Sequence, residues 1–159
     1  MGDNLIRVLV VDDYEPWRRF ARLNILAQEN FHIVGEAADG DEAIQKSQEL
    51  QPDIILLDVS LPTVNGIDAA RKIAQAAPNS KIIFVSENRS PDVAEEALTT
   101  GASGFVIKSD AARELLPAIT AVLEGKRFIS ASLANHFLVA TGLASQTISW
   151  IVTLIAGIS

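Results

Sequence analysis

The sequence contains no cysteine, and its surplus of charge is acidic rather than basic, with 13 Lys and Arg against 20 Asp and Glu and a net charge of -7. The missing thiols exclude disulfide scaffolds, cysteine-ligated zinc and thiol nucleophiles, so any chemistry must come from oxygen and nitrogen groups. The acidic balance argues against a nucleic-acid binder driven by electrostatics. The N-terminus lacks the basic region and the small-residue cleavage site of a secretory signal, so we expect a cytoplasmic protein.

Charge is also absent from one part of the chain. Residues 129–159 contain no Asp, Glu, Lys or Arg, whereas every such residue of the protein lies within residues 1–128. The 159 residues, of which 48% are hydrophobic, are enough to bury the core of one ordinary domain. We therefore expect a domain over residues 1–128 and an uncharged, apolar C-terminal extension over residues 129–159.

Short apolar runs recur through the first region. Four of them, rich in Val and Ile, lie at residues 8–11, 54–57, 82–85 and 105–107, and a weaker one lies at 33–34. They are too short for buried helices, and their apolar residues are continuous, which is typical of parallel strands covered on both faces. Since helical stretches separate the runs, the pattern predicts an α/β fold, namely a doubly wound five-stranded parallel sheet, (βα)5.

Helix signals fill the gaps between these runs. Asp39 followed by Glu42 is a capping-box pattern, and Ser90 before a proline provides a cap with a proline in the first turn. Pro16 likewise suits the first turn of a helix. The apolar residues that follow it at helical spacing are Trp17, Phe20, Leu23 and Ala27, and we expect them to form the buried face of that helix.

Polar side chains come directly after four of the runs. Asp12 and Asp13 follow the first run, Asp58 the second of the four, Ser86 the third and Lys108 the last. Ligands of doubly wound sheets bind outside the carboxyl ends of the strands, so we expect these side chains to converge on one rim. Carboxylate oxygens without cysteine or paired histidine ligands favour Mg²⁺.

Each of these residues has an ordinary interpretation when it is taken alone. An acidic pair after a strand is commonly a solvated turn, a single lysine commonly lies at the surface, and Ser86 would suit a helix cap. Asp58 is more telling, because a carboxylate that closes a buried strand costs free energy unless it is compensated. The combination favours a site, since all these positions fall on the same rim in the order that the fold requires.

The same residues belong to longer motifs. Val-Val-Asp-Asp at residues 10–13, Asp-Ile-Ile-Leu-Leu-Asp-Val-Ser-Leu-Pro at 53–62, Phe-Val-Ser at 84–86 and Gly-Ala-Ser-Gly-Phe-Val-Ile-Lys at 101–108 resemble a response-regulator receiver domain of two-component signalling. The resemblance extends over roughly residues 5–125. It implies the flavodoxin-like strand order 2-1-3-4-5.

The resemblance also implies a role for each matching residue. Asp58 matches the phosphoacceptor, and Asp12 and Asp13 match the acidic pair that, with Asp58, holds Mg²⁺. Ser86 matches the hydroxyl that follows the phosphoryl group, and Lys108 matches the lysine that binds it. Ser60 matches the residue whose backbone carbonyl completes the metal ligands, and Phe105 matches the aromatic switch residue.

A receiver domain implies partners and an output. It would accept phosphate from a histidine kinase or a phosphotransfer protein and then signal by a change of conformation, so we expect a switch and not an enzyme that turns over a substrate. Gly-Lys-Arg-Phe-Ile-Ser at 125–130 resembles the NarL/FixJ class, whose receivers are joined to a LuxR-type helix-turn-helix. Residues 129–159 carry no basic side chains for phosphate contacts, so we expect no DNA binding by this chain. A single-domain regulator and a regulator truncated within its linker both fit.

Several structures fit the extension. Apolar residues recur at helical spacing from Leu133 to Ile158, which predicts a weakly amphipathic helix that needs a partner surface. The β-branched residues at 147–155 leave a strand open, and polar interruptions argue against a membrane span. We expect the helix to pack on the last helix of the receiver or on the same segment of a second copy, which would give a two-fold dimer.

Three other functions match the sequence less well. A phosphatase of the haloacid-dehalogenase type also uses an aspartate nucleophile with Mg²⁺, but it needs a second aspartate two positions later, where this chain has Ser60. A flavodoxin-like cofactor binder would need a glycine-rich phosphate loop after the first strand, where Asp12 and Asp13 would repel the phosphate. An adaptor that works without phosphorylation fits poorly, because the full set of chemical residues is present.

Overall fold

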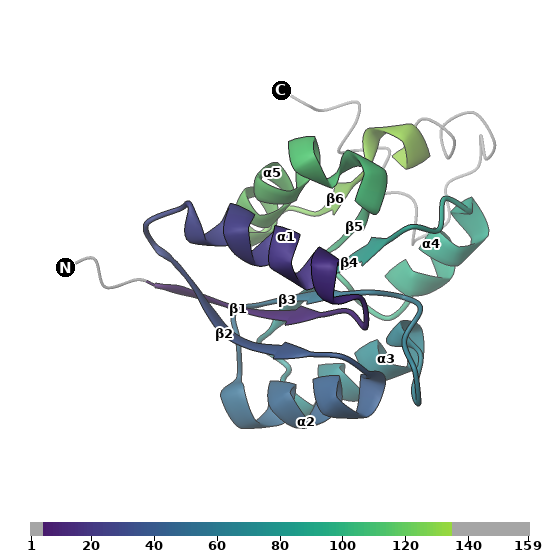
Figure 1. Cartoon of the computed structure of the whole chain (residues 1–159). Coiled ribbons are helices and arrows are strands. Elements are labelled where there is room, and N and C mark those ends of the chain that lie inside the picture. Colours follow the sequence, from purple (N-terminus) through teal and green to yellow (C-terminus); the bar gives the residue numbers. More distant parts are fainter. Residues whose placement is uncertain (1–4, 135–159) are drawn as a thin grey trace.

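The structure is a computed structural model of the chain, and it describes residues 5–134. Strands and helices alternate along this part of the chain (Figure 1). The elements are β1 Ile6–Val11, α1 Glu15–Leu26, β2 Phe31–Ala37, α2 Gly40–Leu50, β3 Ile54–Leu57, α3 Gly66–Ala76, β4 Lys81–Ser86, α4 Pro91–Leu98, β5 Gly104–Ile107, the 3-10 turn Lys108–Asp110, α5 Ala111–Leu123 and β6 Phe128–Ile129. Within residues 5–134, no helix is both long and apolar enough to span a membrane. The amphipathic helix, the dimer contact and the membrane question for the extension lie outside the described residues.

The described strands form one six-stranded parallel sheet in the order β2-β1-β3-β4-β5-β6. The first five confirm the predicted order 2-1-3-4-5 and the doubly wound arrangement. The sheet is one strand wider than predicted, because Phe128–Ile129 pair with β5 at the edge. Backbone hydrogen bonds make this pairing, with Phe128 N donating to Ser103 O at 3.1 Å and Ser130 N donating to Phe105 O at 2.9 Å. A strand of two residues is too short to show in an apolar pattern.

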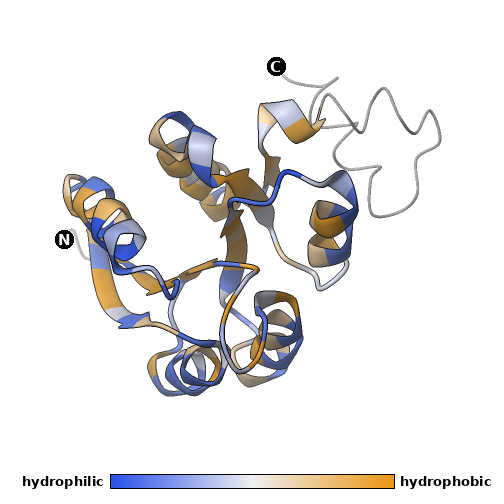
Figure 2. Cartoon of the chain, turned by 45° about the vertical axis from the view of Figure 1, so that its right-hand side comes forward, coloured by the Kyte–Doolittle hydropathy of each residue, from blue (hydrophilic) through white to orange (hydrophobic). Residues whose placement is uncertain are grey.

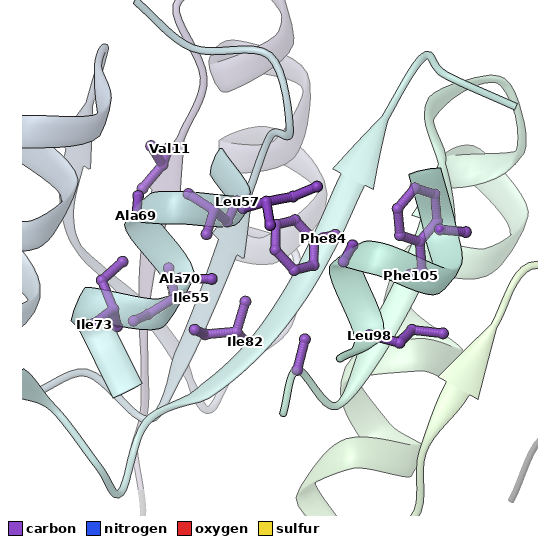
Figure 3. Close-up of a cluster of buried hydrophobic side chains, with 14 of the residues drawn as sticks. Val11, Ile55, Leu57, Ala69, Ala70, Ile73, Ile82, Phe84, Leu98 and Phe105 are labelled. Atoms are coloured by element: carbon purple, nitrogen blue, oxygen red, sulfur yellow. The ribbon is translucent and has the colours of Figure 1, made fainter. Parts of the chain in front are cut away.

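Helices cover both faces of the sheet. α1 and α5 pack on one face, and α2, α3 and α4 pack on the other (Figure 1). The strands between them are apolar, and the helices turn their apolar sides towards the sheet (Figure 2). Figure 3 shows the core under α3 and α4, where the rings of Phe84 and Phe105 have their centroids 6.2 Å apart. Burial on both faces explains why the strand sequences are continuous apolar runs.

Side-chain hydrogen bonds cap the N-termini of α2 and α4. The carboxylate of Asp39 accepts from the backbone N of Glu42 at 2.8 Å, and Glu42 in turn accepts from the backbone N of Ala38, so the predicted capping pair is present. Ser90 caps α4 by accepting from the backbone N of Val93 at 3.5 Å. Each cap satisfies an N–H group that the first helical turn would leave unpaired.

The buried face of α1 differs in part from the predicted one. Trp17, Ala21 and Ile25 are buried, whereas Leu23 and Ala27, which we placed on the apolar face, are exposed, and Ala27 lies just beyond the end of the helix. Residues two apart on a helix do not share a face. Leu23 therefore points away from the sheet because Ala21 and Ile25 face it.

The first residues of the expected extension belong to the packed domain. Ile129, Leu133 and Ala134 are buried in the same core cluster as Phe105. Residues 131–134 form a helical turn directly after β6. The boundary that we expected at residue 128 thus falls inside a packed segment, residues 128–134. We placed it where charged residues end in the sequence, but the uncharged residues that follow still pack in the core.

Candidate functional site

The carboxyl ends of the four central strands lie level with one another. Val11 pairs with Leu57 across β1 and β3. Ser86 pairs with Ile107 across β4 and β5. The residues that end or follow these strands therefore meet at one edge, as predicted, and they enclose a cavity of about 390 Å³. Its lining residues are Asp12, Asp13, Tyr14, Asp58, Ser60, Ser86, Glu87, Asn88 and Lys108.

Three carboxylates gather in this cavity. Asp12, Asp13 and Asp58 each offer an oxygen within 4.8 Å of the other two. Asp12 is fully buried and Asp58 is 6% exposed, whereas Asp13 is exposed. Like charges about 4 Å apart repel by roughly 4 kcal/mol at an effective dielectric constant near 20. A cation held here would offset that repulsion, and a set of hard oxygen donors suits Mg²⁺, so the residues fit the predicted ion.

Lys108 supplies a positive charge in the same cavity. Its Nζ lies 2.5 Å from Asp12 Oδ2 and 3.5 Å from Asp58 Oδ2. Burial acts to lower the pKa of Lys108, but the hydrogen bond to Asp12 and the negative charges of Asp58 and Asp12 outweigh it, so the pKa is raised above its ordinary value. The ammonium group therefore stays charged at neutral pH, within reach of a group bound to Asp58.

The environment of Asp58 raises its pKa to about 7. Burial is the largest cause and the charge of Asp12 is the next, while Lys108 acts in the opposite direction. The backbone N of Ser60 also opposes the rise, since it donates to Asp58 Oδ1 at 3.3 Å. A cation bound beside Asp58 would favour the ionised carboxylate, which is the form that can act as a nucleophile.

A close backbone approach fixes the loop that follows Asp58. Gly66 N donates to Val59 O at 2.7 Å. A Cβ added to Gly66 would lie 1.9 Å from the carbonyl oxygen of Asp58, so any side chain here would displace the loop. The loop places Ser60 at the cavity as predicted. The role of its backbone carbonyl as a metal ligand stays a prediction.

Ser86 and Phe105 lie on the neighbouring strands β4 and β5. Ser86 is 1% exposed, and its Oγ accepts from the backbone N of Asn88 at 3.0 Å. Phe105 is fully buried, so its ring begins from an interior position and not from solvent. The roles that the resemblance implies for these residues, with Ser86 following the phosphoryl group and Phe105 acting as the aromatic switch, stay predictions.

Trp17 also reaches the site, which the sequence did not lead us to expect. Lys108 Nζ lies 5.3 Å from the centroid of the Trp17 ring. Trp17 follows Asp13 by four residues, and this position in the first turn of the helix after the acidic pair was the available signal. Tyr14 and Glu87 line the cavity beyond the predicted set as well.

The order of the sheet and the acidic pocket at its carboxyl edge define the flavodoxin-like receiver class of α/β fold. The chain belongs to the response regulator receiver domain family, which matches residues 8–120. It is 34% identical over 132 residues to response regulator GacA of Pseudomonas viridiflava, and the aligned region covers 83% of this chain and 62% of GacA. It is 39% identical over 102 residues to the chemotaxis protein CheY of Thermotoga maritima, and the aligned region covers 64% of this chain and 84% of CheY.

Solved structures agree with this assignment. A LuxR-family two-component response regulator from Aurantimonas sp. SI85-9A1 superposes with a TM-score of 0.81 at 35% identity, covering 84% of this chain and 96% of that one. The predicted resemblance to NarL- and LuxR-type regulators is therefore confirmed. Receiver domains act as phosphoacceptor switches and generally bind Mg²⁺ in an acidic pocket. The chain spans less than two thirds of the length of GacA.

Proposed function

We propose that this chain is a response regulator that accepts a phosphoryl group on Asp58 from a histidine kinase or a phosphotransfer protein. An oxygen of the Asp58 carboxylate attacks phosphorus, the bond between phosphorus and the donor imidazole breaks, and the imidazole leaves. The product is an acyl phosphate on Asp58, which water later hydrolyses. The observation that carries this proposal is the meeting of Asp58, two further carboxylates and Lys108 in one cavity.

The neighbouring residues supply what an anionic nucleophile needs to approach an anionic phosphoryl group. Asp12, Asp13, Asp58 and the backbone carbonyl of Ser60 are the residues that would hold Mg²⁺, and the ion would neutralise charge on the phosphoryl oxygens. Lys108 neutralises the remaining charge, because its Nζ already lies 3.5 Å from Asp58 Oδ2. The acyl phosphate adds roughly 1.5 to 2 negative charges, if it ionises as other phosphorylated side chains do.

The signal is a change of conformation. Ser86 can exchange its contact with the backbone N of Asn88 for a hydrogen bond to a phosphoryl oxygen. Phe105 on the adjacent strand packs in the same core as the segment 128–134, so a shift of β5 would reach that segment. This is a bistable element biased by one local charge, which is how phosphorylation switches commonly work.

The extension over residues 129–159 is the proposed route to an output. Its first residues pack on β5, and we propose that the rest contacts the receiver or a second copy of the chain, with a homodimer as one outcome. The alternative, a NarL/FixJ-type transcriptional regulator whose DNA-binding domain is missing from this chain, is not favoured by the comparisons, in which the family match is a receiver domain at residues 8–120. A phosphatase of the aspartate-nucleophile type is disfavoured by Ser60, because this position then needs a carboxylate for acid–base catalysis.

Intact-mass measurement after incubation with acetyl phosphate and Mg²⁺ tests the proposal. The wild type should gain one phosphate, and Asp58→Asn should gain none. Asp53→Asn is a matched control, because Asp53 precedes the same strand but lies at its other end, and this variant should be phosphorylated like the wild type. Equal phosphorylation of Asp58→Asn and the wild type would refute the assignment.

A further inference from the structure

Lys108 has two kinds of neighbour at its ammonium group. The carboxylates of Asp12 and Asp58 lie 2.5 and 3.5 Å from Nζ. The centroid of the Trp17 ring lies 5.3 Å from the same atom. A cation within about 6 Å of an aromatic centroid is attracted by the ring quadrupole. Since the Lys108 side chain is only 12% exposed, water screens this attraction less than it would at the surface.

The position of the Trp17 ring is fixed by groups other than Lys108. Trp17 is 9% exposed, and it follows Pro16 in the first turn of α1. Its ring packs against Phe20 with the centroids 5.0 Å apart. Its backbone N donates to Tyr14 O at 3.1 Å. The indole is thus a prepared surface for the lysine and not a side chain that Lys108 itself holds in place.

Lys108 also separates two cavities. One is the acidic cavity that contains Asp58, and the other is an adjoining cavity of about 480 Å³ on the side of α1. The residues that line the second cavity are Tyr14, Pro16, Trp17, Phe20, Glu87, Arg89, Lys108 and Ser109. Removing the indole would enlarge this second space and let the flexible lysine stem move into it. The ammonium would then lie farther from Asp58.

We propose that Trp17 is a positioning residue for phosphotransfer, which holds the Lys108 ammonium beside Asp58 by a cation–π contact and by filling the space into which the lysine could move. The proposal rests on the function proposed above for Asp58. Trp17 does not line the acidic cavity that contains Asp58, and its ring faces the Lys108 ammonium, so it acts through Lys108. A charge that is already in place when the phosphoryl group arrives costs no reorganisation during transfer.

Rates of phosphorylation by acetyl phosphate, followed by intact mass at saturating Mg²⁺, test this role in the full chain. Trp17→Leu should lower the rate by about three- to tenfold, within the range of a partly buried cation–π contact. Trp17→Phe keeps an aromatic face and should retain most of the rate. The affinity for Mg²⁺, measured by calorimetry, should be unchanged in both, because the carboxylates are intact. Trp17→Met, whose unbranched and flexible side chain can adapt to the space, should lose rate like Trp17→Leu and serves if that variant does not fold.

Two controls separate positioning from a general loss of structure. Ile25→Val alters a buried residue of the same helix that lines neither cavity, so it should lower the melting temperature without slowing phosphorylation. In a Lys108→Ala background, Trp17→Leu should produce no further loss of rate, because there is no ammonium to position. The proposal is overturned if Trp17→Leu and Trp17→Met are phosphorylated at the wild-type rate, if Ile25→Val slows the reaction equally, or if the loss persists without Lys108. Phosphorylation of Asp58→Asn would instead refute the underlying function.

Discussion

The carboxyl edge of the sheet has two halves that are held in different ways. In the half formed by β1 and β3, the carboxylates accept hydrogen bonds from residues next to them in the chain. In the half formed by β4 and β5, strand β5 is bound to residues far along the sequence. The backbone N of Tyr14 donates to Asp12 Oδ1 at 2.9 Å, and the backbone N of Ser60 donates to Asp58 Oδ1 at 3.3 Å. Each donor lies two residues beyond the carboxylate that it binds. The acidic half is therefore built by local turns.

The other half depends on the segment 128–134. The backbone N of Ile107, the residue before Lys108, donates to Ser130 Oγ at 2.8 Å, and this hydroxyl donates to Glu114 Oε1 on α5 at 2.5 Å. Ser130 is fully buried. A movement of Lys108 towards a phosphoryl group would thus pull on a strand whose partners are distant in sequence. We infer that the acidic half holds the nucleophile and the carboxylates that would bind metal, while the other half supplies the charge of Lys108 and carries the response.

Removing the charge of the second half should have the largest effect on phosphorylation. Lys108→Ala should slow the reaction with acetyl phosphate by about 100-fold, the typical loss when one prepared electrostatic group is removed. Lys126→Ala is the matched control, because the Lys126 side chain is 65% exposed and pairs with Glu124. Equal rates for the two variants would show that the rim does not need charge from β5.

Cutting the link between β5 and the C-terminal segment should cost stability. Ser130→Ala leaves the N–H of Ile107 and the carboxylate of Glu114 without their shared partner, and unsatisfied buried groups cost about 1–3 kcal/mol. Urea unfolding measures this loss. Ser132→Ala is the control, since Ser132 is exposed and makes a longer hydrogen bond of 3.4 Å to Asp110, and it should cost less than about 0.5 kcal/mol. If the two losses are equal, Ser130 does not anchor the segment.

Relieving the charge of the acidic half should stabilise the metal-free protein. Asp13→Asn removes one of three crowded charges, so the melting temperature in EDTA should rise by an amount equivalent to about 1 kcal/mol after screening of the exposed Asp13 by water. The rise on adding Mg²⁺ should be smaller than in the wild type. An unchanged response to Mg²⁺ would contradict the place of Asp13 among the metal ligands.

The raised pKa of Asp58 gives the stability of the metal-free protein a pH dependence of definite sign. Because the folded pKa of about 7 exceeds the ordinary aspartate value of 3.8, the folded protein binds more protons between those two pH values. Stability in EDTA should therefore fall as the pH rises from 5 to 8, by roughly a few degrees in melting temperature. Asp58→Asn should flatten this fall. A fall of the same size in Asp58→Asn would assign it to another group.

The sequence was most informative where function depends on the ends of buried strands. Asp12, Asp58, Ser86 and Lys108 could be placed on one edge because parallel strands share a direction and the apolar runs mark their ends. The wider sheet could not be foreseen, since β6 has two residues and is fixed by hydrogen bonds to the distant Ser103 and Phe105. Pairing across such a distance leaves no periodic trace in the sequence.

The contribution of Trp17 to the site was missed for a related reason. Its spacing indicated a buried helical residue, which the structure confirms, but a helical pattern does not say which strand end lies beneath the first turn. The contact between Trp17 and Lys108 depends on how α1 packs across the sheet. Leu23 shows the opposite error. Its spacing placed it on the buried face of the helix, but its side chain is exposed.

Backbone amide NMR with beryllofluoride and Mg²⁺, which mimic the phosphorylated state, tests most directly whether the acidic half drives the other half. In the wild type, amides near Asp13, Asp58 and Ser60 should shift together with those of Ile107 and Ser130. In Ser86→Ala, the first group should still shift while the shifts of Ile107 and Ser130 are largely lost. Full shifts at Ile107 and Ser130 in Ser86→Ala, or no shifts near Asp58 in the wild type, would contradict the account.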